Sequence, residues 1–206
     1  MRRWEWLTLW LFVIAAVVWG TILLTYALYP VFIYKDGLLN ACGLSFRRLY
    51  HNYGQLLAYL QLPWITHLHM QDFASSPSGA QHFRDVRHLF LLAIGVVWVT
   101  AFPAIRTWRR LRQKKERWRF VRPFWIGAVI PVILGGLMAI NFDAVFIRFH
   151  QLLFRNDDWL FDPALDPIIN VLPEDFFMVC FAAALLLFEV VMAYGIWRGR
   201  QDARLT

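Results

Sequence analysis

Four long apolar stretches run through the chain, and polar segments separate them. The apolar stretches cover approximately residues 6–29, 88–105, 124–146 and 176–197. A bilayer core of about 30 Å requires roughly 20 predominantly apolar helical residues, so each stretch is long enough to cross it. The pattern predicts an all-α integral membrane protein with four transmembrane helices, and we expect residues 1–206 to form a single membrane domain.

The first apolar stretch follows Arg2 and Arg3, as the apolar region of a secretory signal peptide would. It is longer than such a region, and the segment "TYALYPVF" offers no cleavage site flanked by small residues. We therefore expect this stretch to be a retained membrane anchor.

The first polar segment contains a different pattern, in which apolar residues recur at helical spacing. The segment "GLSFRRLYHNYGQLLAYLQL" spans residues 43–62. Its apolar stripe contains Leu49, Tyr53, Leu56, Leu57 and Leu60, opposed by Arg47, Arg48, His51 and Gln55. This pattern predicts an amphipathic helix in the first outer loop, lying in the membrane interface. Packing of the stripe against the ends of the spans is the alternative, and the pattern alone does not separate the two.

Composition and charge support the membrane assignment and predict a topology. Hydrophobic residues make up 59% of the chain, more than a soluble domain of this length needs. Lys and Arg number two at the N-terminus, nine in residues 106–122 and three after Trp197, against five and two in the outer segments 30–87 and 147–175. The positive-inside rule then places both termini and the basic loop in the cytoplasm.

The net charge of +7 is thus mainly a topology signal, and it also favours contact with anionic membrane lipid. We expect no nucleic-acid partner, because the chain lacks a soluble domain carrying base-reading aromatic residues.

Residues able to do chemistry concentrate in the two outer segments. All six histidines, all four serines and nine of the 14 acidic residues lie there or at the adjoining span ends, whereas residues 106–122 contain no histidine and one acid, Glu116. Long polar loops also collect polar residues by chance. The asymmetry nevertheless indicates that any chemistry takes place on the outer side.

Metal and covalent mechanisms find little support in these residues. His67, His69, Asp72 and His82 form an imaginable ligand set, but their spacing matches no HExxH or CxxC pattern. No GxSxG motif occurs. Cys42 and Cys180 allow a disulfide or a thiol nucleophile, yet two buried, unpaired thiols are the simpler expectation. We therefore expect no cofactor and no metal.

Acid and base catalysis by histidine is the remaining chemistry. His82 and Asp85 are three residues apart, so on a helix they share a face, and Asp85 can fix the tautomer of the ring. His150 lies where the third span is expected to leave the hydrocarbon. Packing at the interface is the alternative for both histidines, just as helix capping is for Glu174 and Asp175.

Two segments resemble a known family. "SGAQHFRDVRHLF", starting at Ser78, and "FHQLLFRNDDWLFDPALDPIINVLPEDFF", starting at Phe149, resemble signatures of the lipoprotein intramolecular transacylases (Lit). The four-span layout and the segment "YHNYGQLLAYL" are also similar to that family. Phe83 departs from it, because the family commonly has a longer aliphatic residue after the first histidine.

The resemblance implies an acyltransferase of the bacterial cytoplasmic membrane, with its site facing the outer leaflet and diacylglyceryl-modified lipoproteins as its partners. The enzyme would move the sn-2 acyl chain from glycerol to the α-amine of the N-terminal cysteine, giving a lyso-form lipoprotein. It further implies the catalytic residues His82, His150, Asp85 and Asp166. Candidate substrate-binding residues are Arg84, Arg87, Arg148, Trp159 and Glu174.

The sequence also allows two functions of other classes. One is a non-enzymatic membrane assembly or interaction protein, which would co-purify with a partner. The other is a histidine-rich metal-handling membrane protein, which would carry stoichiometric zinc or copper. The transacylase hypothesis instead predicts that lipoproteins change when the gene is expressed.

Overall fold

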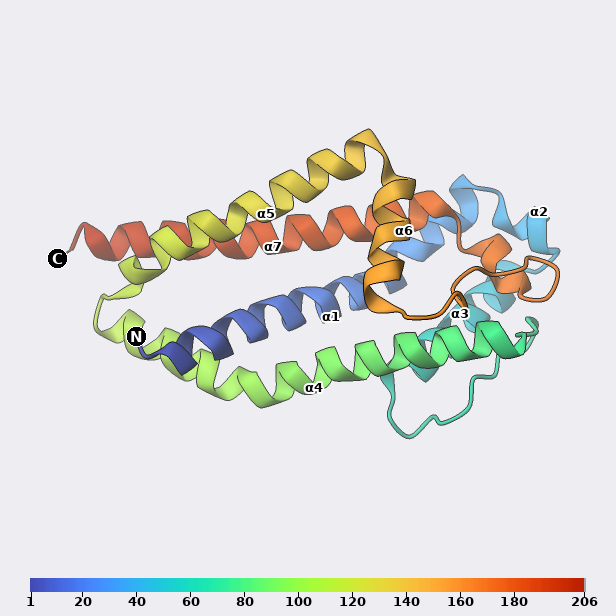
Figure 1. Ribbon diagram of the computed structural model, residues 1–206, viewed down its shortest axis with the longest axis horizontal. Coiled ribbons are helices and arrows are strands. Elements are labelled where there is room, and N and C mark those ends of the chain that lie inside the picture. Colours follow the sequence, from blue (N-terminus) through green and yellow to red (C-terminus); the bar gives the residue numbers. More distant parts are fainter. Residues whose placement is uncertain (206) are drawn as a thin grey trace. The chain divides into compact units, whose positions relative to one another are not determined.

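The computed structural model describes residues 1–205, and within them the chain is helical with no strand (Figure 1). In chain order the elements are α1 (Arg3–Lys35), α2 (Leu38–Cys42), α3 (Phe46–Gln61), α4 (Pro77–Gln113), η1 (Arg117–Phe120), α5 (Val121–Ile140), α6 (Phe142–Leu153), η2 (Pro167–Val171) and α7 (Glu174–Ala203). Both η elements are short 3₁₀ helices.

Four helical segments are long and apolar enough to cross a membrane, as the sequence predicted. They are Arg3–Lys35, Pro77–Gln113, Arg117–Ile140 and Glu174–Ala203. Three of them begin before and end after the predicted apolar stretches, because an apolar window marks the part of a helix that can lie in hydrocarbon and not the ends of the helix. The all-helical fold with four candidate spans is therefore confirmed, whereas the orientation in the membrane stays a prediction.

The third stretch ends earlier than predicted. Helix α5 stops at Ile140, and Asn141 has an extended backbone with φ −159° and ψ 96°. Residues 142–146, which we expected to finish the third span, instead begin the separate helix α6. Asparagine competes with the helical backbone for hydrogen bonds, so it favours such a break. His150 consequently lies on its own helix and not at the end of a span.

The basic segment 106–122 is mostly helix, although the sequence indicated a loop. Helix α4 continues to Gln113, and only Lys114, Lys115 and Glu116 separate it from η1. Arginine, leucine and glutamine all have high helix propensity, so nothing in residues 106–113 stops α4. The chain reverses at Lys115, whose φ of 54° lies in the left-handed region.

The described residues cluster into two compact units. Unit 1 contains Met1–Thr21, Ala93–Phe142 and the chain from Phe181 onward, and unit 2 contains Ile22–Leu92 and Asp143–Cys180. The core of unit 1 includes Leu111, Phe120, Phe124 and Met192. At one place in this unit the Arg117 guanidinium donates to both carboxylate oxygens of Asp202, at 2.8 and 2.7 Å, and both residues are buried.

Unit 2 has a larger core, to which the amphipathic helix α3 contributes its whole apolar stripe. The five stripe residues named above are all buried in a cluster with Tyr29, Ile33, Phe83 and Phe176. Tyr29 stacks on Tyr53 with ring centroids 3.9 Å apart. The stripe of α3 is thus a packing surface within the protein, as the alternative interpretation held. The location of this helix in the membrane interface remains a prediction.

Candidate functional site

His82 and His150 meet in unit 2, from α4 and α6. Their ring centroids lie 5.9 Å apart, although 68 residues separate them in the chain. His82 is buried and His150 is half-buried. Phe154 packs on both, at 4.8 Å from His82 and 5.7 Å from His150, and Phe161 lies 5.4 Å from His82. The two titratable rings therefore share an aromatic environment.

The hydrogen bond of His150 fixes its tautomer. Its Nδ1 atom lies 2.8 Å from the carbonyl oxygen of Phe146, one turn earlier in α6. A carbonyl oxygen can only accept, so Nδ1 carries the proton and, in the neutral ring, Nε2 keeps its lone pair. Burial also lowers the pKa of His150 from its usual value, which favours the neutral form. His150 is therefore arranged as a base at Nε2.

Trp159 covers one face of the His150 ring. The two rings stack with centroids 4.9 Å apart and an interplanar angle of 29°. Trp159 belongs to the segment that follows α6, and its sequence position had suggested a substrate contact. Its position next to His150 is compatible with that prediction, and it also limits the access of water to the ring.

Asp85 does not hydrogen bond to His82, contrary to the sequence-based expectation. Its carboxylate accepts from Gln81 Nε2 at 2.8 Å and from Asn156 Nδ2 at 3.0 Å. His82 Nδ1 is buried and has no hydrogen-bond partner among residues 1–205. The reason is that the His82 ring packs against Phe154 and Phe161, while Asp85, one turn along α4, is bound to Asn156. Although Asp85 and His82 share a face of α4, no hydrogen bond joins them.

Asp166 holds the start of α4 and does not contact either histidine ring through a hydrogen bond. Its Oδ1 atom accepts from the Ser76 backbone N–H and its Oδ2 from the Ser76 hydroxyl, both at 2.7 Å. The Ser76 hydroxyl also accepts from the Gly79 N–H at 2.9 Å. A buried carboxylate at the N-terminus of a helix is favoured by the helix dipole. Asp166 thus fixes the first turn of the helix that carries His82.

Two further contacts join the segment after α6 to the first turns of α4. Asp158 accepts from the Ser78 hydroxyl at 2.7 Å, and Asn156 donates to Asp85 as described. Sequence reasoning missed Ser78, Asn156 and Asp158. The serines at the start of an apolar helix were the available signal, because serine is a preferred residue at helix N-termini.

The arginines have unequal roles. Arg87 is buried, and its guanidinium donates to the backbone carbonyls of Tyr59, Pro63 and Ile65 while lying 4.8 Å from the Tyr59 ring. Arg87 therefore holds the last turn of α3 and the chain that follows it in place, which corrects the expectation that it binds substrate. Arg84 is exposed and donates to Gln81 at 3.0 Å.

Two more predicted substrate-binding residues lie on α6 and at the start of α7. Arg148 is exposed and donates to Gln151 at 3.1 Å, one turn further along α6. Glu174 is the first residue of α7, and the Asp143 carboxyl is its neighbour. Arg148 is therefore accessible to a ligand at the surface, whereas an acidic neighbour stands beside Glu174.

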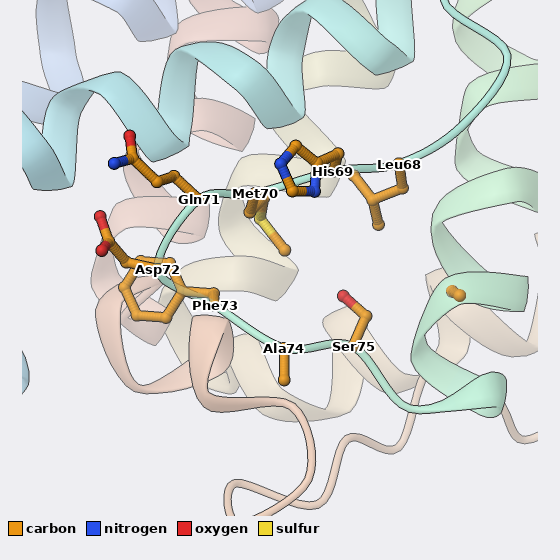
Figure 2. Close-up of a pocket in the computed structure, with 9 residues that line it drawn as sticks. Leu68, His69, Met70, Gln71, Asp72, Phe73, Ala74 and Ser75 are labelled. Atoms are coloured by element: carbon orange, nitrogen blue, oxygen red, sulfur yellow. The ribbon is translucent and has the colours of Figure 1, made fainter.

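A cavity of about 470 Å³ lies elsewhere in unit 2. Residues 68–75 and Ala80 line it, and Met70 and Ser75 point into the space that this segment curves around (Figure 2). Asp72 accepts from Arg48 and, at 2.7 Å, from Asn52. Neither His82 nor His150 lines this cavity, so we place the candidate site at the histidine pair, where the titratable groups meet.

Two other arrangements considered from the sequence are a metal-ligand cluster and a disulfide, and residues 1–205 form neither. Within residues 1–205, no three His, Cys, Asp or Glu side chains gather in a way that could hold a metal ion. Cys42 and Cys180 are both free, as the simpler expectation had it, although each is half-exposed and not buried.

Comparison with known proteins agrees with these features. The family model of the lipoprotein intramolecular transacylase Lit matches residues 4–177. The chain is similar to the crystal structure of the membrane-integral Lit of Bacillus cereus, with a TM-score of 0.85 and 28% identity over 98% of this chain and 96% of that one. No curated protein matched the chain.

Two variant structures of the same Bacillus cereus protein are similar to the chain as well. One has a histidine replaced by arginine, with a TM-score of 0.77 over 92% of that chain, and the other has a histidine replaced by alanine, with 0.78 over 94%. Both are 27% identical to this chain and cover 98% of it. The matched family model and the shared four-helix architecture lead to one conclusion: the chain is a multi-pass membrane acyltransferase that belongs to the lipoprotein intramolecular transacylase family.

Proposed function

We propose that this protein moves the sn-2 acyl chain of a diacylglyceryl-modified bacterial lipoprotein to the α-amine of its N-terminal cysteine. The product is a lyso-form lipoprotein with an N-terminal amide. The observation that carries the proposal is the pair of histidines, His82 and His150, whose rings lie 5.9 Å apart in a cluster of aromatic side chains. Family membership supports the class of substrate.

The donor ester and the acceptor amine sit on the same modified cysteine. The enzyme therefore binds and orients a single substrate. Proximity of the reacting groups can lower the activation barrier by about 7 kcal/mol. Direct attack of the amine on the ester also needs no acyl-enzyme, which agrees with the absence of a GxSxG motif.

His150 is the base in this proposal. The substrate α-ammonium has a pKa of about 7.7 to 8.0, so roughly a fifth to a third of it is neutral amine near pH 7.4. As the amine attacks the ester carbonyl, its nitrogen gives up a proton, and His150 Nε2 accepts it because Nδ1 is held by the Phe146 carbonyl. The C–N bond forms and the carbonyl oxygen becomes an oxyanion.

His82 is the acid in this proposal. Collapse of the tetrahedral intermediate breaks the bond to the glycerol oxygen, which must gain a proton. His82 supplies that proton from its ring N–H, and the proton taken up by His150 returns to His82, so the pair ends unchanged. Asp166 acts as a positioning residue, through the first turn of α4.

The reaction also determines where the site should lie. The ester of a membrane-anchored lipoprotein sits near the lipid headgroups, so the histidines belong at that depth. We propose a single membrane domain in the bacterial cytoplasmic membrane, with both termini in the cytoplasm and the site open to the outer leaflet. The excess of Lys and Arg at the termini and in residues 106–122 supports this orientation.

Replacement of each histidine by glutamine tests the proposal. His82→Gln and His150→Gln remove the titrating nitrogen but keep a polar side chain, and each should lower turnover by about 100 to 10,000-fold. Groups that act as a unit are strongly non-additive, so the double variant should be scarcely slower than the slower single variant. Mass spectrometry of a diacylglyceryl lipopeptide and its N-acyl lyso product measures the conversion.

His88→Gln is the matched control, because His88 lies on the same helix and is exposed. It should convert the lipopeptide at the rate of the unaltered protein. Thermal midpoints in detergent separate loss of chemistry from loss of folding. If the two site variants fold and convert substrate as fast as the His88 variant, the histidine pair is packing and the proposal fails.

A further inference from the structure

A second cavity lies in unit 1, and no residue of the proposed reaction lines it. It has a volume of about 510 Å³ and is lined by Met1, Trp6, Trp118, Arg119, Val121 and Arg122. The lining comes from the start of α1, from η1 and from the start of α5. Apolar and aromatic surface therefore stands next to two guanidinium groups in one open space.

The charges around this cavity are not balanced. Arg119 has an acidic neighbour, Glu116, at 3.3 Å. Arg122 is exposed and forms no ion pair with any residue in 1–205. The nearby acid of α1, Glu5, is buried and already pairs with Arg110 at 2.7 Å. A positive charge thus remains at the cavity, and it would attract an anion.

The surroundings of the cavity are those of a lipid headgroup region. Half-exposed tryptophans gather in the terminal parts of the unit 1 helices, namely Trp4, Trp118, Trp125 and Trp197. Arginines lie over three of these rings: Arg119 over Trp118 at 5.3 Å, Arg198 over Trp197 at 5.2 Å and Arg200 over Trp125 at 5.8 Å. Tryptophan is enriched where a protein crosses the membrane interface, and arginine extends its charge toward the headgroups.

We propose that this cavity binds the headgroup of an anionic phospholipid. The phosphate lies between the guanidinium groups of Arg119 and Arg122, which can each donate two hydrogen bonds to phosphate oxygens. Trp6 and Trp118 cover the glycerol and the first carbons of the acyl chains. A membrane lipid fits better than a soluble anion, because four of the six lining residues are apolar or aromatic and half-exposed tryptophans stand around the cavity.

Native mass spectrometry of the full protein, or microscale titration in a neutral detergent, tests this proposal with short-chain phosphatidylglycerol as the probe. Phosphatidylcholine of the same chain length is the neutral comparison. One Lys or Arg near a charged lipid surface contributes about 1 kcal/mol, so Arg122→Gln should weaken phosphatidylglycerol binding about fivefold. Arg119→Gln should weaken it to a similar or smaller extent, since Glu116 already neutralises part of that charge.

Arg109→Gln is the matched control. Arg109 belongs to the same basic segment, is exposed, and does not line the cavity. The proposal requires that this variant bind phosphatidylglycerol like the unaltered protein. Equal weakening by the Arg109 and Arg122 variants would show a diffuse charge effect and overturn the site.

Two other outcomes would also overturn the proposal. Equal binding of phosphatidylcholine would mean that the cavity takes lipid without regard to charge. Displacement of the lipid by millimolar inorganic phosphate, at constant ionic strength, would identify a site for a free anion. All variants are judged by binding, so the result is independent of whether the protein transfers acyl chains.

Discussion

Gly79 lies where α4 meets the segment that carries Asp166 and Phe161, and an added methyl group would separate them. A Cβ atom at Gly79 would stand 2.2 Å from Asp166 Oδ1 and 2.9 Å from Phe161 Cε1. Normal contacts begin at about 3.5 Å, so Gly79→Ala requires a shift of roughly 1 Å. Asp166 cannot give way freely, because it is buried and bound to Ser76 through both of its oxygens.

The expected cost follows from these contacts. Overpacking of a buried site costs about 1–3 kcal/mol, and loss of a hydrogen bond to a charged group about 1.5–3 kcal/mol. Alanine regains at most about 1 kcal/mol of helix propensity relative to glycine. A net loss of about 2 kcal/mol or more would lower the thermal midpoint by about 4–8 °C for a chain of this size.

The same change should reduce catalysis by the folded protein. Phe161 lies 5.4 Å from the His82 ring and 5.3 Å from the Phe83 ring, so its displacement opens the pocket around His82. A misplacement of about 1 Å at a reacting group can cost about 100-fold in rate. Turnover of a diacylglyceryl lipopeptide, normalised to folded protein, measures this loss.

Gly54→Ala is the control for helix propensity. Gly54 lies in α3, also in unit 2, and a Cβ atom there would meet nothing within 4 Å. This variant should be as stable as the unaltered protein or slightly more so, with unchanged turnover. The reasoning is refuted if Gly79→Ala matches Gly54→Ala in both thermal midpoint and turnover.

Three further predictions concern pH, a buried ion pair and topology. Because burial lowers the pKa of His150, the kcat/KM profile should show a His150 limb on the acid side of the limb that the substrate ammonium sets at about pH 7.7 to 8.0; Trp159→Ala exposes the ring and should move the His150 limb upward. Asp202→Asn leaves the buried Arg117 guanidinium without its carboxylate and should destabilise the protein by about 3 kcal/mol, measured as a lower thermal midpoint, with lipopeptide turnover per folded molecule unchanged. In a background with Cys42 and Cys180 replaced by alanine, an impermeant thiol reagent applied to intact cells should label a cysteine introduced at exposed Trp64, but should label one at Lys114 only after permeabilisation; the reverse pattern would contradict the predicted orientation.

The sequence alone determined that the chain is helical and crosses a membrane. Apolar runs of about 20 residues have few alternatives to a membrane-spanning helix, because hydrocarbon offers the backbone no hydrogen-bond partners. The helical stripe of α3 was also readable, since helical periodicity is a local property. The signatures around His82 and His150 pointed to the family before any contact was known.

Tertiary structure decided how those residues meet. Spacing along the chain could not show that His150 lies on a separate helix beyond Asn141, that its Nδ1 is bound to Phe146, or that its ring reaches His82. A shared face of α4 suggested a bond between Asp85 and His82, yet Asp85 pairs with Asn156, 71 residues away. Each of these outcomes depends on contacts between distant segments, and local periodicity carries no information about them. Physically, a helix sets which side chains share a face, whereas packing against other segments sets which partner each side chain finds.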